Sequence, residues 1–72
     1  MEGFAERLRW LRESKRPVVS RKVVSELCGL HSDAIRRYER GEALPTADAL
    51  AKIADYYSVS ADYLLGRAPY GK

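Results

Sequence analysis

The sequence has few of the residues that form covalent or metal cross-links, and it has no long apolar run. A single cysteine, Cys28, excludes an internal disulfide, and a single histidine argues against a zinc site of the usual Cys/His kind. No apolar run approaches the length of a membrane span, and residues 1–15 carry charges throughout, unlike a signal peptide. We therefore expect a cytoplasmic protein with no bound metal and no cofactor, in which Cys28 is a buried thiol.

Residue sets for catalysis are also missing. The sequence has no Ser/His/Asp set at a plausible spacing and no glycine-rich loop for a phosphate. Its 72 residues correspond to one domain and are too few to enclose a substrate pocket. We expect a binding domain rather than an enzyme, with no small-molecule substrate and no membrane contact.

Positive charge is in excess, and it is unevenly distributed. The net charge is +3. Residues 1–40 hold ten Lys or Arg against six Asp or Glu, a net of +4, whereas residues 41–72 hold three against four, a net of −1. Residues 7–22 carry seven basic side chains and a single acid, Glu13. This asymmetry favours a polyanionic partner for the N-terminal half, although a moderately basic surface also occurs in proteins that bind no nucleic acid.

Hydrophobic periodicity predicts five short helices, and no stretch alternates with the period of two that a strand requires. The expected helices are about residues 4–14, 21–28 after an N-cap at Ser20, 31 or 32 to 40, 45–57, and 61–65 after an N-cap at Ser60. Pro17 blocks helix in the first connection, and Gly29 stands where a helix ends in a left-handed residue.

The third expected helix has a polar and an apolar side. At about 100° per residue, Ile35 and Tyr38 fall on the apolar side, which would anchor the helix to the core. The polar side carries Ser32, Asp33, Arg36, Arg37 and Arg40. A solvated surface helix would show the same division. Two features favour a surface that reads nucleic acid: three arginines with only one acid, and a short link around Gly29 that suits a helix-turn-helix.

The run of residues 20–41, SRKVVSELCGLHSDAIRRYERG, resembles the helix-turn-helix of the lambda-repressor/Cro-like (XRE) family. It aligns without a gap to the family pattern Ser-Gln-x-x-Leu-Ala-x-x-Leu-Gly-Val-Ser-x-x-x-Ile-Ser-x-Tyr/Trp-Glu-x-Gly. The matched positions are Val24, Ser25, Cys28, Gly29, Leu30, Ile35, Tyr38, Glu39 and Gly41. Downstream, PTADALAKIA at 45–54 and VSADYLLG at 59–66 resemble the family's fourth and fifth helices, so the resemblance covers about residues 4–66.

This resemblance implies an all-α, compact five-helix lambda-repressor-like DNA-binding domain with the helix-turn-helix at helices two and three. The domain would span residues 1–66 and precede a flexible C-terminal tail, residues 67–72. Helix three, about residues 32–40, would lie in the major groove of double-stranded DNA. The residues expected to read bases are Ser32, Asp33, Arg36 and Arg37. The residues expected to contact phosphates are Arg21, Lys22 and Arg40.

The chemistry of these residues agrees with the implied roles. Arginine presents a fork that matches the N7 and O6 acceptors of guanine. Arg21 and Lys22 stand at a helix N-terminus, whose N–H groups favour a phosphate. The Asp33 carboxylate is repelled by phosphates, so it would accept from cytosine N4, restrain a neighbouring arginine or serve as the acid at the helix start. We expect the last two together.

Three features depart from the family pattern. Arg21 replaces a Gln that braces the recognition helix, and arginine can neutralise a phosphate but cannot accept a hydrogen bond. His31 replaces the usual Ser or Thr cap, and imidazole is a poor cap, so Ser32 either caps the helix or contacts a base. The link KRPVV at residues 15–19 is about two residues longer than usual. It is either simply a longer loop or a segment that adds a phosphate contact through Lys15 or Arg16.

Two groups of residues are expected to hold the fold or an interface. By the resemblance, Glu39 pairs with Arg12 of the first helix in a partly buried ion pair. The large aromatic residues at or near the C-terminal helices, or off the main stripe of the first helix, are Trp10, Tyr56, Tyr63 and Tyr70. They are either partly buried beneath the fifth helix and the tail or part of a dimer contact, because interfaces favour aromatic residues.

The sequence therefore predicts a sequence-specific, double-stranded DNA-binding transcriptional regulator, a repressor that acts as a homodimer on two half-sites. The alternative is a protein-interaction module of the same fold, such as an antitoxin or a co-regulator. In that case the aromatic patches would matter more than the arginines.

Overall fold

The structure is a computed structural model that describes residues 3–70. Between these residues it contains five helices: α1 (Phe4–Ser14), α2 (Arg21–Leu27), α3 (Ala34–Glu39), α4 (Ala47–Tyr57) and α5 (Ala61–Leu64). No strand occurs in that range, so the predicted all-α class with five helices is confirmed. Residues 1–2 and 71–72, the ends of the predicted domain and tail, lie outside the described residues. The division of the chain at residue 66 stays a prediction.

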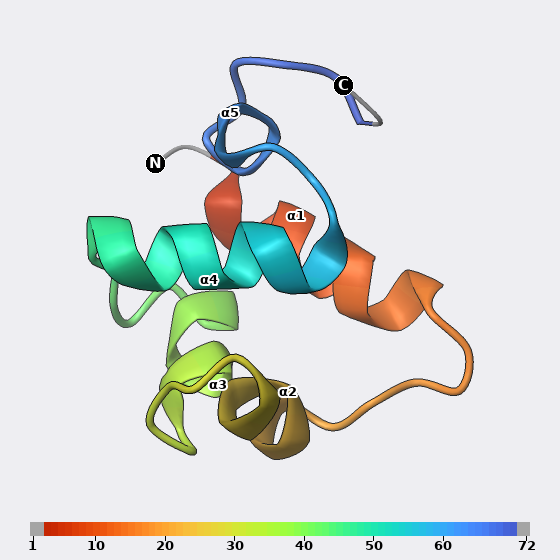
Figure 1. Cartoon of the computed structure of the whole chain (residues 1–72), viewed down its shortest axis with the longest axis vertical. Helices are drawn as coiled ribbons and strands as arrows, with labels where there is room; N and C mark the ends of the chain where they lie inside the picture. Colours follow the sequence, from red (N-terminus) through yellow and green to blue (C-terminus); the bar gives the residue numbers. More distant parts are fainter. Residues whose placement is uncertain (1–2, 71–72) are drawn as a thin grey trace.

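The core lies where the helices converge. Figure 1 shows α4 crossing the middle of the molecule, with α5 on one side of it and α2 and α3 on the other. α1 contacts both α3 and α5. The most deeply buried apolar side chains are Phe4, Leu8, Leu11, Val24, Ile35, Ile53 and Leu64, each at most 2% exposed. Burying one such side chain contributes roughly 1.5–3 kcal/mol, so the apolar stripes seen in the sequence supply the main stabilisation.

Three helices begin at capping side chains. Ser20, Thr46 and Ser60 each accept a hydrogen bond from the backbone N–H three residues on, at 3.2, 3.1 and 3.0 Å. The N-caps predicted at Ser20 and Ser60 are therefore confirmed, and each cap contributes about 1 kcal/mol. Gly29 has a φ of 74°, the left-handed conformation expected at the end of α2.

The start of α3 differs from the prediction. The helix begins at Ala34, not at His31 or Ser32, and its N-cap residue Asp33 makes no side-chain cap hydrogen bond. The preceding residues form a turn that satisfies the backbone donors locally. The Asp33 N–H donates to His31 Nδ1 at 3.2 Å, and the Ala34 N–H donates to the His31 carbonyl at 2.9 Å. The His31 ring therefore caps the turn that precedes α3 and not the helix itself, and Ser32 makes no cap hydrogen bond to α3.

Candidate nucleic-acid interface

α3 is fixed to α2 by a buried serine. Ser25 is fully buried, and its hydroxyl donates to the Arg21 carbonyl at 2.8 Å. The same oxygen accepts the Ile35 N–H at 3.0 Å, so a side chain of α2 satisfies one of the free donors in the first turn of α3. This role of Ser25 was not predicted from the sequence. The sequence offered one indication of it: Ser25, a small residue with a hydroxyl group, follows Val24 on the side of α2 that packs into the core.

α3 is fixed to α1 by a buried ion pair. Arg12 Nε lies 2.7 Å from Glu39 Oε2, and Arg12 Nη2 lies 3.1 Å from Glu39 Oε1. The Glu39 side chain is fully buried, and that of Arg12 is 13% exposed. The hydrogen bonds to Glu39 raise the pKa of Arg12. Arg12 and Glu39 therefore pair as the resemblance implied, and this pair leaves no uncompensated charge beneath α3.

Arg9 is a second basic residue at this carboxylate, and its contact with Glu39 was not predicted from the sequence. Its Nε lies 3.9 Å from Glu39 Oε1, and its Nη2 donates to the Glu39 carbonyl at 3.4 Å. Arg9 stands three residues before Arg12, a spacing that places both side chains on one side of a helix. That spacing could have indicated that Arg9, like Arg12, lies near Glu39.

On the outer side of α3, Asp33 and Arg36 form a two-pronged pair. Arg36 Nε lies 2.6 Å from Asp33 Oδ1, and Arg36 Nη2 lies 2.7 Å from Asp33 Oδ2. Hydrogen bonding to Arg36 lowers the pKa of Asp33, and the same bonds raise the pKa of Arg36. Of the roles considered for Asp33, the structure therefore shows one: its carboxylate holds the neighbouring side chain of Arg36 in place.

The other residues expected to contact DNA are accessible but differ in their partners. Arg40 is exposed, and its Nε lies 2.9 Å from Glu42 Oε2. Arg37 is exposed and forms no ion pair within residues 3–70. Ser32 and Lys22 are exposed, and Arg21 is half-buried at the start of α2. Two of the three α3-side arginines thus already hold a carboxylate, and Arg37 has none.

A shallow hollow of about 310 Å³ lies beside Arg37. It is lined by His31, Ala34, Arg37, Tyr38, Ala43 and Leu44. Leu44 stands in the connection between α3 and α4 and is 65% exposed. The surface around Arg37, which has no ion-pair partner within residues 3–70, is therefore recessed and partly apolar.

The aromatic residues are divided between core and surface. Tyr63 is buried, whereas Trp10 and Tyr70 are about half exposed. The Tyr70 ring lies edge-on to Trp10, with a centroid distance of 5.0 Å, and to Tyr63 at 5.6 Å. The tail thus contributes one ring to a cluster with α1 and α5, and two of its three rings remain accessible.

Two features were sought in the described part of the chain: a cluster of metal ligands and a helix able to cross a membrane. Residues 3–70 contain no group of three or more His, Cys, Asp or Glu side chains placed to hold a metal ion. Over the same range, no helix has both the length and the apolar character needed to cross a bilayer. Cys28 is a buried free thiol, as predicted, and burial raises its pKa.

Comparison with known proteins gives three findings. The family model described as "Helix-turn-helix domain" matches residues 4–64. The chain is 46% identical over 39 residues to the cryptic phage CTXphi transcriptional repressor RstR of Vibrio cholerae serotype O1. That match covers 54% of this chain and 35% of the repressor, so it spans about a third of the curated relative's length.

The third finding is structural. The fold is similar to that of the P22 c2 repressor protein, solved in complex with synthetic operator 9T in the presence of Tl⁺, with a TM-score of 0.80 and 26% sequence identity. The match covers 90% of this chain and 96% of that one. The five-helix, lambda-repressor-like fold that the sequence implied is therefore confirmed.

Proposed function

The chain belongs to the helix-turn-helix domain family, and from that premise we propose that it is a sequence-specific, double-stranded DNA-binding transcriptional repressor of the XRE group. One observation supports this most. α3 is held to the core by Ile35 and Glu39 while Arg37 stands exposed without a carboxylate partner within residues 3–70. The matching fold of a repressor in complex with an operator supports the same function.

In this proposal, α3 enters the major groove and Arg37 is the main reader of bases. Its guanidinium can make the bidentate contact to guanine N7 and O6 without first leaving an internal partner. Arg36 and Asp33 act as one unit, because a guanidinium held on both oxygens keeps a fixed orientation. Ser32 contacts a base from the turn before α3, since it makes no cap hydrogen bond there.

Phosphate contacts come from Arg21 and Lys22 at the start of α2 and from Arg40 after α3. These side chains neutralise the backbone and release counterions, which makes the affinity depend on salt. Arg40 would exchange Glu42 for a phosphate, a small cost because both side chains are exposed.

The protein acts in the cytoplasm as a homodimer, without cofactor or enzymatic activity. A single module of this size gives modest specificity, and two copies on half-sites about 34 Å apart would read twice the sequence. The exposed rings of Trp10 and Tyr70 are the dimer contact that we favour, because aromatic side chains of this exposure suit an interface.

Selection of bound duplexes from a random pool, followed by sequencing, tests this function. We expect a recurring motif with two similar half-sites about one helical turn apart. Arg37→Ala should lower affinity for that motif by about 1–3 kcal/mol and relax the preference at one base pair. The matched control is Arg67→Ala, which removes the same charge from the exposed residue after α5 and should retain the motif.

A protein-interaction module of the same fold is the second candidate. The observation that favours it is the exposure of apolar side chains, with Leu27 and Leu44 at 62% and 65%. The double substitution Arg36→Ala and Arg37→Ala separates the two functions. Loss of operator binding with fold and self-association intact supports DNA reading, whereas unchanged regulation in the cell supports the interaction module.

A further inference from the structure

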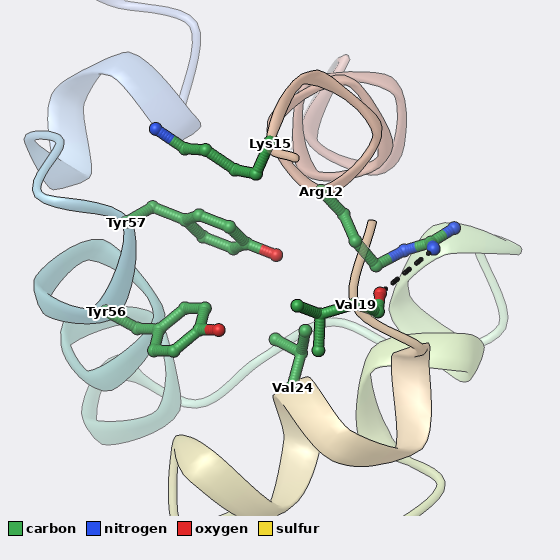
Figure 2. Close-up of a pocket in the computed structure, with 6 residues that line it drawn as sticks. All are labelled: Arg12, Lys15, Val19, Val24, Tyr56 and Tyr57. Atoms are coloured by element: carbon green, nitrogen blue, oxygen red, sulfur yellow. Dashed lines mark hydrogen bonds between the residues drawn. The ribbon is translucent and has the colours of Figure 1, made fainter. Parts of the chain in front are cut away.

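A second cavity has a volume of about 250 Å³, and none of the residues proposed to contact DNA lines it. Its lining comes from α1, the link to α2, α2 and the end of α4, and consists of Arg12, Lys15, Val19, Val24, Tyr56 and Tyr57. Figure 2 shows the phenol rings of Tyr56 and Tyr57 projecting from α4 toward Val19 and Val24. None of these six residues is expected to read a base, and only Lys15, a basic side chain of the first link, was considered for a phosphate contact.

The Tyr57 hydroxyl is a buried donor without a partner. Tyr57 is 6% exposed, and within residues 3–70 its hydroxyl oxygen forms no hydrogen bond. Figure 2 shows this hydroxyl pointing between the side chains of Arg12 and Val19, into the space that the six residues enclose. Burial raises the pKa of the phenol, so the group stays protonated at neutral pH and can donate. A buried donor of this kind costs folding free energy unless an acceptor reaches it.

The charges around the cavity favour an anionic acceptor. The guanidinium of Arg12 is turned toward Glu39 and the Val19 carbonyl, so Arg12 contributes mainly its apolar stem to the wall. Lys15 is exposed and forms no ion pair in the described part of the chain. Its side chain extends past Tyr57 in Figure 2, and its flexible stem allows the ammonium to approach the mouth of the cavity. No carboxylate lines the cavity.

The volume of the cavity limits the size of the ligand that it can hold to about one aromatic ring. An apolar cavity of about 150 Å³ holds a benzene molecule, and drug-sized ligands need roughly 300–1,000 Å³. A cavity of about 250 Å³ therefore has room for one ring and a single polar substituent. Two valines and two phenol rings supply apolar walls for that ring.

We propose that this cavity binds a small aromatic carboxylate. The ring lies against Tyr56, Val19 and Val24. The carboxylate accepts a hydrogen bond from the Tyr57 hydroxyl and pairs with the Lys15 ammonium.

Titration of the ¹⁵N-labelled protein with sodium benzoate, at constant ionic strength and without DNA, tests the proposal by NMR. We expect saturable shifts of the backbone amides around Val19, Val24 and Tyr57. Benzyl alcohol, a neutral molecule of similar size, should bind about tenfold more weakly, because a carboxylate makes the stronger, charge-assisted hydrogen bond.

Tyr57→Phe keeps the ring and removes only the hydroxyl. This variant should bind benzoate about tenfold more weakly, and it should be at least as stable as the parent because no hydrogen bond within residues 3–70 is lost. The matched control Tyr56→Phe should stay within about twofold, since Tyr56 is 36% exposed and water can satisfy its hydroxyl. Shifts that never saturate, or equal benzoate affinities for the two variants, would overturn the proposal. The DNA-binding proposal would stand in either case, because no DNA enters the experiment.

Discussion

Asp33 and Arg36 hold each other on the outer side of α3, and this changes what Arg36 can do. Both oxygens of Asp33 lie within 2.7 Å of Arg36 nitrogens, so two of the guanidinium's N–H groups are engaged. Arg36 can meet a base only with its remaining donors or after leaving Asp33. Arg37, one position further, has no such restraint in the described chain. Arg36 and Arg37 carry equal charge, but only Arg37 can contact a base without first breaking a hydrogen bond to Asp33.

The pH dependence of the Asp33 carboxyl tests this pair. Because hydrogen bonding to Arg36 lowers the folded-state pKa, the pair adds stability above the carboxyl's unfolded value of about 3.9. That contribution is lost as the pH falls through the folded-state pKa. An NMR titration should give a midpoint below about 3.9 in the parent protein and close to it in Arg36→Ala. Arg37→Ala removes an equal charge that makes no hydrogen bond to Asp33, so its midpoint should move less.

At the scale of elements, Ser25 joins the two helices of the helix-turn-helix. Replacing it with alanine leaves the Ile35 N–H buried without an acceptor, which costs about 1–3 kcal/mol. We expect Ser25→Ala to lower the free energy of unfolding by that amount in urea denaturation followed by circular dichroism. The smaller side chain fits the site, so a steric clash does not contribute.

Ser14→Ala is the matched control for Ser25→Ala. The Ser14 hydroxyl also bonds to a carbonyl of its own helix, that of Trp10 at 2.5 Å, but at an exposed position. Water replaces an exposed hydrogen bond, so the unfolding free energy should change by less than about 0.5 kcal/mol. Equal effects of the two substitutions would contradict the role given to Ser25 between α2 and α3.

The sequence predicts helix ends well only where the stabilising contact is local. The starts of α2 and α5 follow from Ser20 and Ser60, whose side chains cap donors three residues on. The predicted start of α3 was wrong because the first two helical N–H groups, those of Ala34 and Ile35, bond to the His31 carbonyl and to a serine of another helix. Neither contact leaves a capping pattern in the sequence.

For the whole molecule, periodicity predicts the number and class of the elements but not their long-range contacts. The Arg12–Glu39 pair joins residues 27 positions apart, and only the family resemblance pointed to it. The cavity beside Tyr57 is lined by residues of α1, the first link, α2 and α4, so no single segment of the sequence indicates it. The sequence does show directly that positive charge is concentrated in residues 1–40, and this asymmetry should affect how the whole molecule binds DNA.

That consequence is the salt dependence of DNA binding. If Lys22 neutralises one phosphate, Lys22→Ala should weaken binding to all duplexes alike and reduce the slope of log K against log salt by about one. Arg67→Ala lowers the net charge equally, but residue 67 follows α5, across α4 from α3 in Figure 1. For Arg67→Ala the slope of log K against log salt should stay unchanged, because counterions are released only where a phosphate is contacted. Equal slopes for the two variants would mean that net charge, not placement at the start of α2, drives the association.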